Sequence, residues 1–229
     1  MMYQIDRKYR LIVGDLKTKD GIEITDLQVS FDVSKSSDNS QNSNSASIEV
    51  YNLSDETLKT LQTDYPAAYL YIGYGDLKNT KLLFAGQVIN IGTKKQGTDR
   101  VTQLLLGSGY TDLHHSTVTR SIPAGGTSRE CAEEIRKKMP NVDRGVYNGT
   151  NIDSPFINGY TLSGSCKQEL DELARNKKLE WRVDDRVLYV NDKDRAENEN
   201  FNEAYVISPF SGLVEIPYYS SGDRRRSKK

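Results

Sequence analysis

Residues 26–33 read Asp-Leu-Gln-Val-Ser-Phe-Asp-Val, so every second side chain is apolar. An alternation with a period of two is typical of a β-strand that has one face in a core and the other in solvent. Weaker versions of the same pattern predict strands at residues 9–13, 46–51, 69–74, 82–91 and 100–106. About six or seven strands with one helix favour a β-barrel or a β-sandwich in the first half of the chain.

One helix and one polar segment interrupt these strands. Ser54 has the side chain of a helix N-cap, and Leu53 and Leu58 are spaced as a hydrophobic staple, so a helix is expected from Ser54 through Thr63. Residues 35–45 are almost entirely Ser, Asn, Asp and Gln. That composition predicts a mobile polar loop.

The pattern changes to helical spacing after residue 110. Thr127 and Glu130 form a capping-box pair that begins one helix, which Pro140 ends. Ser165 and Gln168 form a second such pair, which begins a helix that is expected to run to residue 176. A loop rich in Asn, Gly and Asp is expected between the two helices.

A hairpin is expected to follow the second helix. Leu179, Trp181 and Val183 alternate with polar residues, a turn is expected at Asp184-Asp185, and an apolar strand returns at 187–190. Two helices packed on a small sheet are the simplest arrangement for this section. Trp181 is expected to seal the contact between them.

These patterns predict an α+β chain in three parts. A β domain is expected at residues 1–110, a small α/β domain of two helices and a hairpin at 111–195, and a shorter third part at 196–229. A charged linker is expected from Asp192 to Asn202, followed by a strand at 205–207 and a basic tail from Arg224 to Lys229.

Composition excludes several classes of protein. The 229 residues carry a net charge of −1, which disfavours dedicated nucleic-acid binding. The longest apolar run, at 82–91, is about half as long as a membrane-spanning helix requires. The N-terminus lacks a signal peptide, so we expect synthesis in the cytosol. Only 36% of residues are hydrophobic, which fits a thin core or a subunit that completes its core in an assembly.

The sequence nominates no catalytic, cofactor-binding or metal-binding residue. The only two histidines, His114 and His115, are adjacent, so they cannot form a spaced triad or metal site and are expected in a linker. Cys131 and Cys166 have the spacing of core residues at the starts of the two helices.

Four further motifs are also interpreted as structural. The segment from Asp192 to Glu197 begins like a calcium loop but lacks its glycine and its final glutamate. Gly107-Ser108-Gly109 lacks a third glycine, and no helix is expected after it, so a dinucleotide site is unsupported. Tyr69, Tyr71 and Tyr74 could form an aromatic platform, but a half-buried strand face is favoured. The basic tail, Arg224 to Lys229, could touch phosphates or an acidic partner, although such a run is usually solvated.

Six strings occur in a characteristic order along the chain: Phe31-Asp-Val-Ser-Lys, Asn44-Ser-Ala-Ser-Ile-Glu-Val-Tyr-Asn-Leu-Ser54, Leu83-Phe-Ala-Gly-Gln-Val-Ile-Asn90, Ser121-Ile-Pro-Ala-Gly-Gly-Thr127, Leu170-Asp-Glu-Leu-Ala174 through Trp181 to Val190, and Ile207-Ser-Pro-Phe-Ser-Gly-Leu-Val214. Taken together, they resemble the baseplate hub proteins of contractile phage tails, the late control protein D family, which is related to the hub part of type VI secretion spikes.

The resemblance implies a homotrimer with two tube-like β-barrels in each subunit, which together match a hexameric tail tube. Residues 9–110 would be the first barrel, 111–195 an inserted domain, and 196–229 a partial second barrel. Family members continue with several more strands, whereas a dozen residues follow Pro217 here. The second barrel is therefore expected to be incomplete or to be supplied partly by another polypeptide.

The function implied is that of a non-enzymatic virion protein in the tail baseplate, made in the host cytoplasm. It would join the tail tube to the central spike, contact other baseplate proteins, pass DNA through a channel without binding it specifically, and need no cofactor and no membrane insertion. The polar loop at 35–45 is a candidate contact with the next ring or the spike. Three alternatives stay open: a hexameric distal tail or tube-terminating ring protein, a cell-wall or carbohydrate-binding module around Trp181, and a wall hydrolase for which the sequence shows no site.

Overall fold

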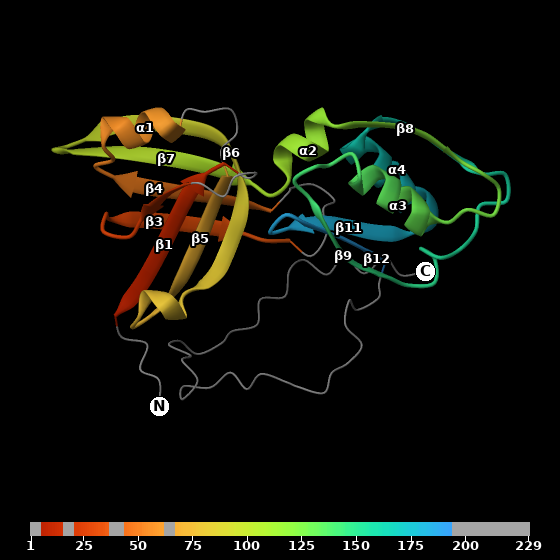
Figure 1. Ribbon diagram of the computed structural model, residues 1–229, viewed down its shortest axis with the longest axis horizontal. Coiled ribbons are helices and arrows are strands. Elements are labelled where there is room, and N and C mark those ends of the chain that lie inside the picture. Colours follow the sequence, from red (N-terminus) through yellow and green to blue (C-terminus); the bar gives the residue numbers. More distant parts are fainter. Residues whose placement is uncertain (1–5, 16–20, 37–43, 62–66, 194–229) are drawn as a thin grey trace, which may run out of the picture.

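The computed structural model describes residues 6–15, 21–36, 44–61 and 67–193. Figure 1 shows an elongated molecule with a large curved sheet at one end and a cluster of helices and small sheets at the other. The short helix α2 (Tyr110–His115) lies between the two ends. We call residues 6–107 the sheet part and residues 110–193 the α+β part. The α+β class predicted from the sequence is confirmed.

The sheet part consists of one antiparallel sheet of seven strands. Its strand order is β2-β1-β5-β6-β7-β4-β3. The strands are β1 (Arg7–Gly14), β2 (Gly21–Ile24), β3 (Val29–Ser34), β4 (Ser45–Tyr51), β5 (Ala67–Tyr74), β6 (Lys81–Gln96) and β7 (Asp99–Gly107). Every strand predicted from period-two alternation in this half is present.

The sheet curls around its own hydrophobic core. Strand β6 is 16 residues long and belongs to both halves of the curled sheet, and its pairing with β7 shifts between Val88 and Asn90. Such a bulge bends a strand and increases its twist. Leu11, Ile48 and Phe84, from three different strands, are each 0% exposed in the resulting core. Each contributes about 2 kcal/mol by leaving water.

The strand pairs that the structure describes do not close the sheet into a barrel. Strands β2 and β3 stand at the two ends of the strand order, and no pairing between them is present among the described residues. The tube-like barrel expected from the resemblance therefore stays a proposal. The predicted strand at 205–207, the basic tail from Arg224 to Lys229 and the rest of 194–229 lie outside the described residues, as do residues 37–43 of the polar segment.

The helix of the sheet part is capped as expected. Helix α1 (Asp55–Leu61) begins after Ser54, whose Oγ accepts a hydrogen bond of 3.1 Å from the Thr57 N–H. Leu53 is buried at its start. The last two residues of the predicted helix, 62 and 63, lie outside the described residues. A short 3₁₀ turn, η1 (Leu77–Asn79), joins β5 to β6.

The α+β part builds a second core from three helices and two small sheets. Its elements are α2, β8 (Thr117–Ile122), α3 (Ser128–Arg136), β9 (Asp143–Asn148), β10 (Tyr160–Ser165), α4 (Cys166–Lys177), β11 (Leu179–Asp184) and β12 (Val187–Asp192). Strand β10 pairs with β8, and β11-β12-β9 form a three-stranded sheet. The two hydrophobic clusters of the molecule share no buried residue.

Both predicted helix starts are confirmed. The capping box of α3 has both of its bonds, because Thr127 Oγ1 accepts from the Glu130 N–H and Glu130 Oε2 accepts from the Thr127 N–H, each at 3.3 Å. The Ser165 Oγ accepts from the Gln168 N–H at 3.2 Å. Trp181 is 5% exposed and lies in the second core, as expected for a residue that seals it.

Two expectations for this part are wrong. The segment between the helices was expected to be a loop, yet it contains β9 and β10; both pair with strands distant in sequence, β12 and β8, and a local pattern carries no signal for such pairs. A helix was not expected after Gly109, yet α2 begins there. Gly109 has a φ of 64°, so it turns the chain from β7 into this helix.

Candidate functional site

The β11–β12 hairpin ends in a two-residue turn, Asp185-Arg186, at the boundary between the two parts. Both residues have positive φ, 47° for Asp185 and 70° for Arg186. Turns of this kind favour Asn-Gly or Asp-Gly, because a side chain in the left-handed region costs about 1 kcal/mol. Here both positions carry charged side chains instead, and both bind the sheet part. We call Asp184, Asp185 and Arg186 the hairpin tip.

Asp185 binds the backbone of the long strand β6. Its Oδ1 accepts a hydrogen bond of 2.8 Å from the N–H of Ala85, which is 1% exposed. Its Oδ2 lies 2.7 Å from the Lys35 Nζ, and the same Nζ lies 3.1 Å from Asp184 Oδ1. Partial burial acts to lower the pKa of Lys35, but the hydrogen bonds and charges of the two aspartates outweigh it and raise that pKa. Lys35 therefore stays charged against the hairpin tip.

Arg186 links three segments at once. Its Nη1 donates to the Tyr69 hydroxyl at 2.6 Å, and its Nε donates to the Asn141 carbonyl at 3.0 Å. Its backbone N–H donates to the Oγ of Ser108, which is 0% exposed, at 3.2 Å. Tyr69 belongs to β5 and Asn141 to the loop after α3, so one side chain connects the sheet part to the α+β part.

Asn44 completes the junction from the sheet side. It is 4% exposed, and its Nδ2 donates to Asp184 Oδ1 at 3.0 Å and to the Val183 carbonyl at 3.4 Å. Its Oδ1 accepts from the Ser36 N–H at 2.7 Å. Lys35, Ser36 and Asn44 are the described ends of the predicted polar loop, so both ends of that segment are held at the junction.

Asp112 is a buried carboxylate beside the same junction. It is 3% exposed, its Oδ1 accepts from Asn141 Nδ2 at 3.3 Å, and its Oδ2 has no hydrogen-bond partner among the described residues. Burial raises its pKa, and this outweighs the opposing effects of hydrogen bonds from Asn141 and of the Arg186 charge. The folded protein therefore favours the protonated form of this group more than the unfolded chain does.

Replacing this carboxylate is expected to stabilise the protein. At pH 7, Asp112→Asn should raise the free energy of unfolding by about 1 kcal/mol, because the neutral amide has nearly the same shape and removes the cost of burying a charge. Because the folded pKa is raised, the stability of the parent should fall as pH rises from the ordinary pKa of an aspartate through the folded value. Urea unfolding of both proteins between pH 4 and 7 measures this: the advantage of the variant should shrink toward pH 4, and a variant less stable than the parent at pH 7 would contradict it.

Asp192 organises the other end of the hairpin. It is 6% exposed, and its carboxylate accepts hydrogen bonds from the N–H groups of Thr150, Asn151 and Ile152 at 2.7, 3.0 and 3.2 Å, and from the Thr150 hydroxyl at 3.2 Å. Gly149, at φ 134°, precedes this loop, and a Cβ there would overlap the carboxylate. The prediction that Asp192 begins a solvated linker is therefore wrong, because it ends β12 in a buried site.

The two histidines and the two cysteines do not form a common site in the structure. His114 and His115 end α2 instead of lying in a linker, and His114 Nδ1 lies 2.9 Å from the Tyr110 carbonyl. Cys131 and Cys166 are each 0% exposed, as expected for core residues. Burial raises the pKa of Cys131 to about 12 and that of Cys166 to about 11, so neither is an activated thiol.

The glycine motif and the tyrosines have structural positions. Ser108, between Gly107 and Gly109, binds Arg186 and donates its N–H to the Asn44 carbonyl at 2.9 Å. The three tyrosines, Tyr69, Tyr71 and Tyr74, are half-buried, as expected. Two of them have different contacts. Tyr69 accepts from Arg186, whereas the ring of Tyr71 lies 4.5 Å from the Arg10 guanidinium carbon.

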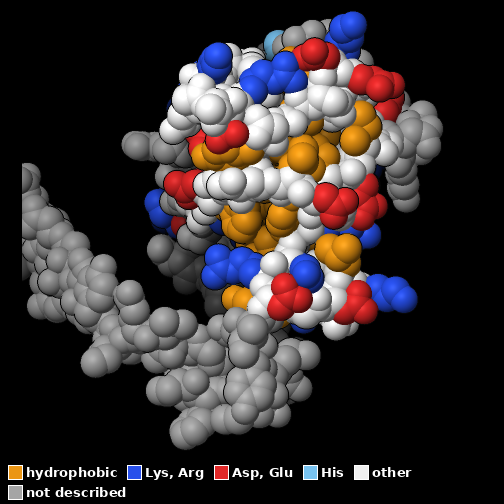
Figure 2. Space-filling view, turned by 90° about the vertical axis from the view of Figure 1, so that its left-hand side faces the viewer, with side chains coloured by type: hydrophobic (Ala, Val, Ile, Leu, Met, Phe, Trp, Pro, Cys, Tyr) orange, Lys and Arg blue, Asp and Glu red, His pale blue; other side chains and the backbone are white. Residues whose placement is uncertain are grey.

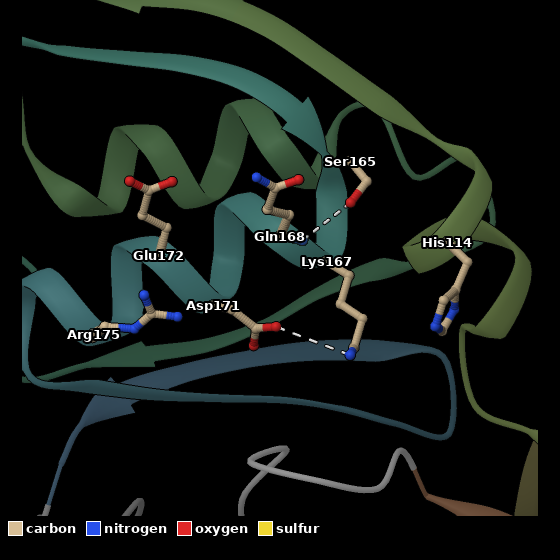
Figure 3. Close-up of a pocket in the computed structure, with 7 residues that line it drawn as sticks. All are labelled: His114, Ser165, Lys167, Gln168, Asp171, Glu172 and Arg175. Carbon is tan, nitrogen blue, oxygen red and sulfur yellow. Dashed lines mark hydrogen bonds and ion pairs between the residues drawn. The ribbon is translucent and has the colours of Figure 1, made fainter.

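A polar hollow of about 410 Å³ lies on the outer face of α4 beside His114. Figure 3 shows that its side chains fan out instead of converging on one point. Lys167 and Asp171 form an ion pair of 4.0 Å one turn apart, and Asp171 also accepts from the Trp181 Nε1 at 3.0 Å. In the described part of the chain, no group of three His, Cys, Asp or Glu side chains could hold a metal ion. We find no catalytic arrangement in this hollow.

The sequence alone predicts neither the contacts of the hairpin tip nor those of Asp192. The available signal for the tip is a two-residue hairpin turn that carries Asp-Arg where Asn-Gly is usual, which indicates that the side chains are needed. For Asp192 the sequence carries no comparable signal, since its partners are backbone N–H groups about forty residues away.

Comparisons with known proteins agree with this architecture. Residues 12–221 match the baseplate hub gp41 family. No curated protein gives a significant match. The tail protein from Neisseria meningitidis MC58 has a similar fold, with a TM-score of 0.55 at 14% identity over 80% of this chain and 50% of that chain. The 43 kDa tail protein of prophage MuSo2 from Shewanella oneidensis has a TM-score of 0.57 at 13% identity, over 81% and 53% of the two chains.

A spike complex gives a third likeness. A chain of the lidded Francisella PdpA-VgrG complex has a TM-score of 0.51 at 10% identity, over 91% of this chain and 32% of that chain. The chain spans about half or less of these structures, and identities this low show a likeness of fold alone.

No described helix has the length and apolar character needed to cross a membrane. The family match covers most of the chain, and the similar solved structures include phage tail proteins. The chain therefore belongs to the baseplate hub gp41 family of structural tail proteins, and its place is the tail baseplate of the virion.

Proposed function

We propose that the protein is a structural adaptor, a homotrimeric hub that joins the tail tube to the central spike and catalyses no reaction. The observation that carries this proposal is the junction at the hairpin tip. An adaptor must hold two docking surfaces at a fixed relative orientation. Hydrogen bonds are directional, so the bonds of Asp185, Arg186 and Asn44 fix that orientation more strictly than an apolar contact would.

The sheet part supports a place in a ring. Strand β2 ends the sheet on one side, and an end strand offers backbone groups along which a neighbouring subunit can continue the sheet. We infer that residues 9–110 form the first tube-like domain, that 111–195 form the inserted domain, and that 196–229 contribute strands to a second, partial barrel. Three such subunits would face a hexameric tube.

Charge and position support the other proposed contacts. A net charge of −1 suits a channel that passes DNA without holding it. Lys35 and Asn44, the described ends of the polar segment, lie at the junction, which supports a contact of this segment with the next ring or with the spike. Other baseplate proteins would bind the outer faces.

The structure offers little to the alternative of a cell-wall module built around Trp181. A sugar-binding tryptophan needs an open ring face for stacking, whereas Trp181 is 5% exposed and its Nε1 is bonded to Asp171. A hexameric distal tail or tube-terminating ring protein differs from the trimeric hub in copy number, which a mass measurement distinguishes.

Co-purification tests the adaptor role. The tagged full chain, co-expressed with the tail tube protein and the central spike protein of its own phage, is expected to elute with both in size-exclusion chromatography. The same chain incubated with purified peptidoglycan is expected to stay in the supernatant. Retention on peptidoglycan, with neither tube nor spike protein bound, would contradict the proposal and favour the wall-binding alternative.

A further inference from the structure

The sheet part has an apolar groove at the end farther from the hairpin tip. The groove has a volume of about 950 Å³ and is lined by Phe31 of β3, Ile72 of β5, and Leu82 and Leu83 of β6. Figure 2 views this end of the molecule and shows apolar side chains gathered in the middle of the face. The charged residues among the described lining are all cationic: Arg7, Lys78 and Lys81.

Strand β3 is incompletely covered beside this groove. Its apolar residues Val29, Phe31 and Val33 are half-buried, whereas Ala46, Ile48 and Val50 of the adjacent strand β4 are at most 4% exposed. Of the strands that the structure describes, only β4 pairs with β3, so its other edge keeps unpaired backbone groups. An apolar strand face next to a free edge is a site where a further extended segment adds to a sheet.

We propose that residues 203–210 of the same chain, Glu-Ala-Tyr-Val-Ile-Ser-Pro-Phe, occupy this groove and add a strand to the free edge of β3. The sequence predicts a strand at 205–207, and Tyr205, Ile207 and Phe210 supply apolar side chains for the groove. Four acidic residues and one arginine lie between 194 and 203, which complements the cationic rim.

The length of chain after Lys193 fits a contact within one molecule. Strand β12 carries the chain about 20 Å from the hairpin tip to Asp192. Asp185 binds Ala85, which lies about 10 Å along β6 from Leu82. The path from Lys193 to the groove is therefore about 30 Å, and residues 194–204 span about 36 Å when extended. Tyr205 can thus reach the groove of its own chain.

The proposed docking covers the β3 end within one subunit, so it can occur whether or not the protein is a trimer. It would leave the β2 end of the sheet for contacts between subunits. The docking also accounts for an incomplete second barrel, because the strand expected at 205–207 would pair with the first sheet instead.

Photo-crosslinking in the full chain tests this docking. The substitution Leu82→p-benzoylphenylalanine places a crosslinker in the groove, at a residue that is 40% exposed, and Val146→p-benzoylphenylalanine on β9, at 49% exposed, is the matched control. After irradiation and trypsin digestion, the Leu82 probe should be joined to the peptide 196–224, which contains no internal Lys or Arg. The Val146 probe, which lies on the α+β part outside the groove, should give little or none of this product.

Unfolding the probe protein together with an equal amount of ¹⁵N-labelled protein in urea, and refolding the mixture so that any oligomer contains both kinds of chain, separates the possible occupants. Docking within one chain predicts products whose two peptides carry the same label. Mixed labels would show a second copy in the groove and overturn the proposal, as would a Leu82 product that lacks the peptide 196–224. The double substitution Tyr205→Ser and Ile207→Ser should lower the yield at Leu82 about tenfold; an unchanged yield would also overturn it.

Discussion

The substitution Asp192→Ala is expected to lower the free energy of unfolding by about 3–5 kcal/mol. The carboxylate is the acceptor for three backbone N–H groups and one hydroxyl, and its loss leaves those donors without a partner in a buried site. The Ile152 carbonyl of the same loop accepts from the Arg129 N–H at 2.9 Å, so the loop also supports the start of α3. Urea unfolding followed by Trp181 fluorescence measures the effect.

The matched control is Asp143→Ala, an exposed aspartate on the neighbouring strand β9. It removes the same charge and is expected to change the free energy of unfolding by no more than about 0.5 kcal/mol. The conservative variant Asp192→Asn keeps one acceptor oxygen and should fall between the two. If Asp192→Ala were as stable as Asp143→Ala, the loop would not depend on this carboxylate.

The substitution Arg186→Gly is expected to uncouple the two parts of the molecule. It removes the bonds of the guanidinium to Tyr69 and Asn141, while Asp-Gly remains a favoured sequence for this turn. Losing these hydrogen bonds should weaken the contact between the two parts by about 2–3 kcal/mol of free energy. Glycine tolerates the positive φ of this position, which should stabilise the hairpin itself by about 1 kcal/mol. The hairpin should therefore stay folded while its contact with the sheet part becomes weaker.

Two spectroscopic probes measure this uncoupling. The protein has one tryptophan, Trp181, whose fluorescence reports on the α+β part, whereas far-UV circular dichroism reports on the secondary structure of both parts. The two unfolding curves should coincide in the parent and separate in Arg186→Gly. The control Arg144→Ala removes an arginine whose ion pair with Glu133 lies within the α+β part, and its curves should still coincide. Coincident curves in Arg186→Gly would show that the junction does not depend on this side chain.

Local patterns were sufficient to predict much of the fold. The alternation of Val29, Phe31 and Val33 predicted β3, and the pairs Thr127–Glu130 and Ser165–Gln168 predicted the starts of α3 and α4. Each of these signals acts within a few residues, so the sequence displays it directly.

The elements that the sequence did not reveal depend on distant partners. Strand β9 forms because it pairs in parallel with β12, and the hairpin tip has its role because Ala85, Lys35 and Tyr69 meet it in space. One sequence cannot display a contact between residues a hundred positions apart. The resemblance to hub proteins supplied the family, and the contacts at the junction came from the structure.

Native mass spectrometry of the hub assembly released from purified virions tests the proposed function most directly. A trimeric adaptor predicts complexes that contain three copies of the 25.8 kDa chain, together with tube or spike protein. Complexes that contain six copies would contradict the trimeric hub and would instead identify a hexameric ring protein of the tail.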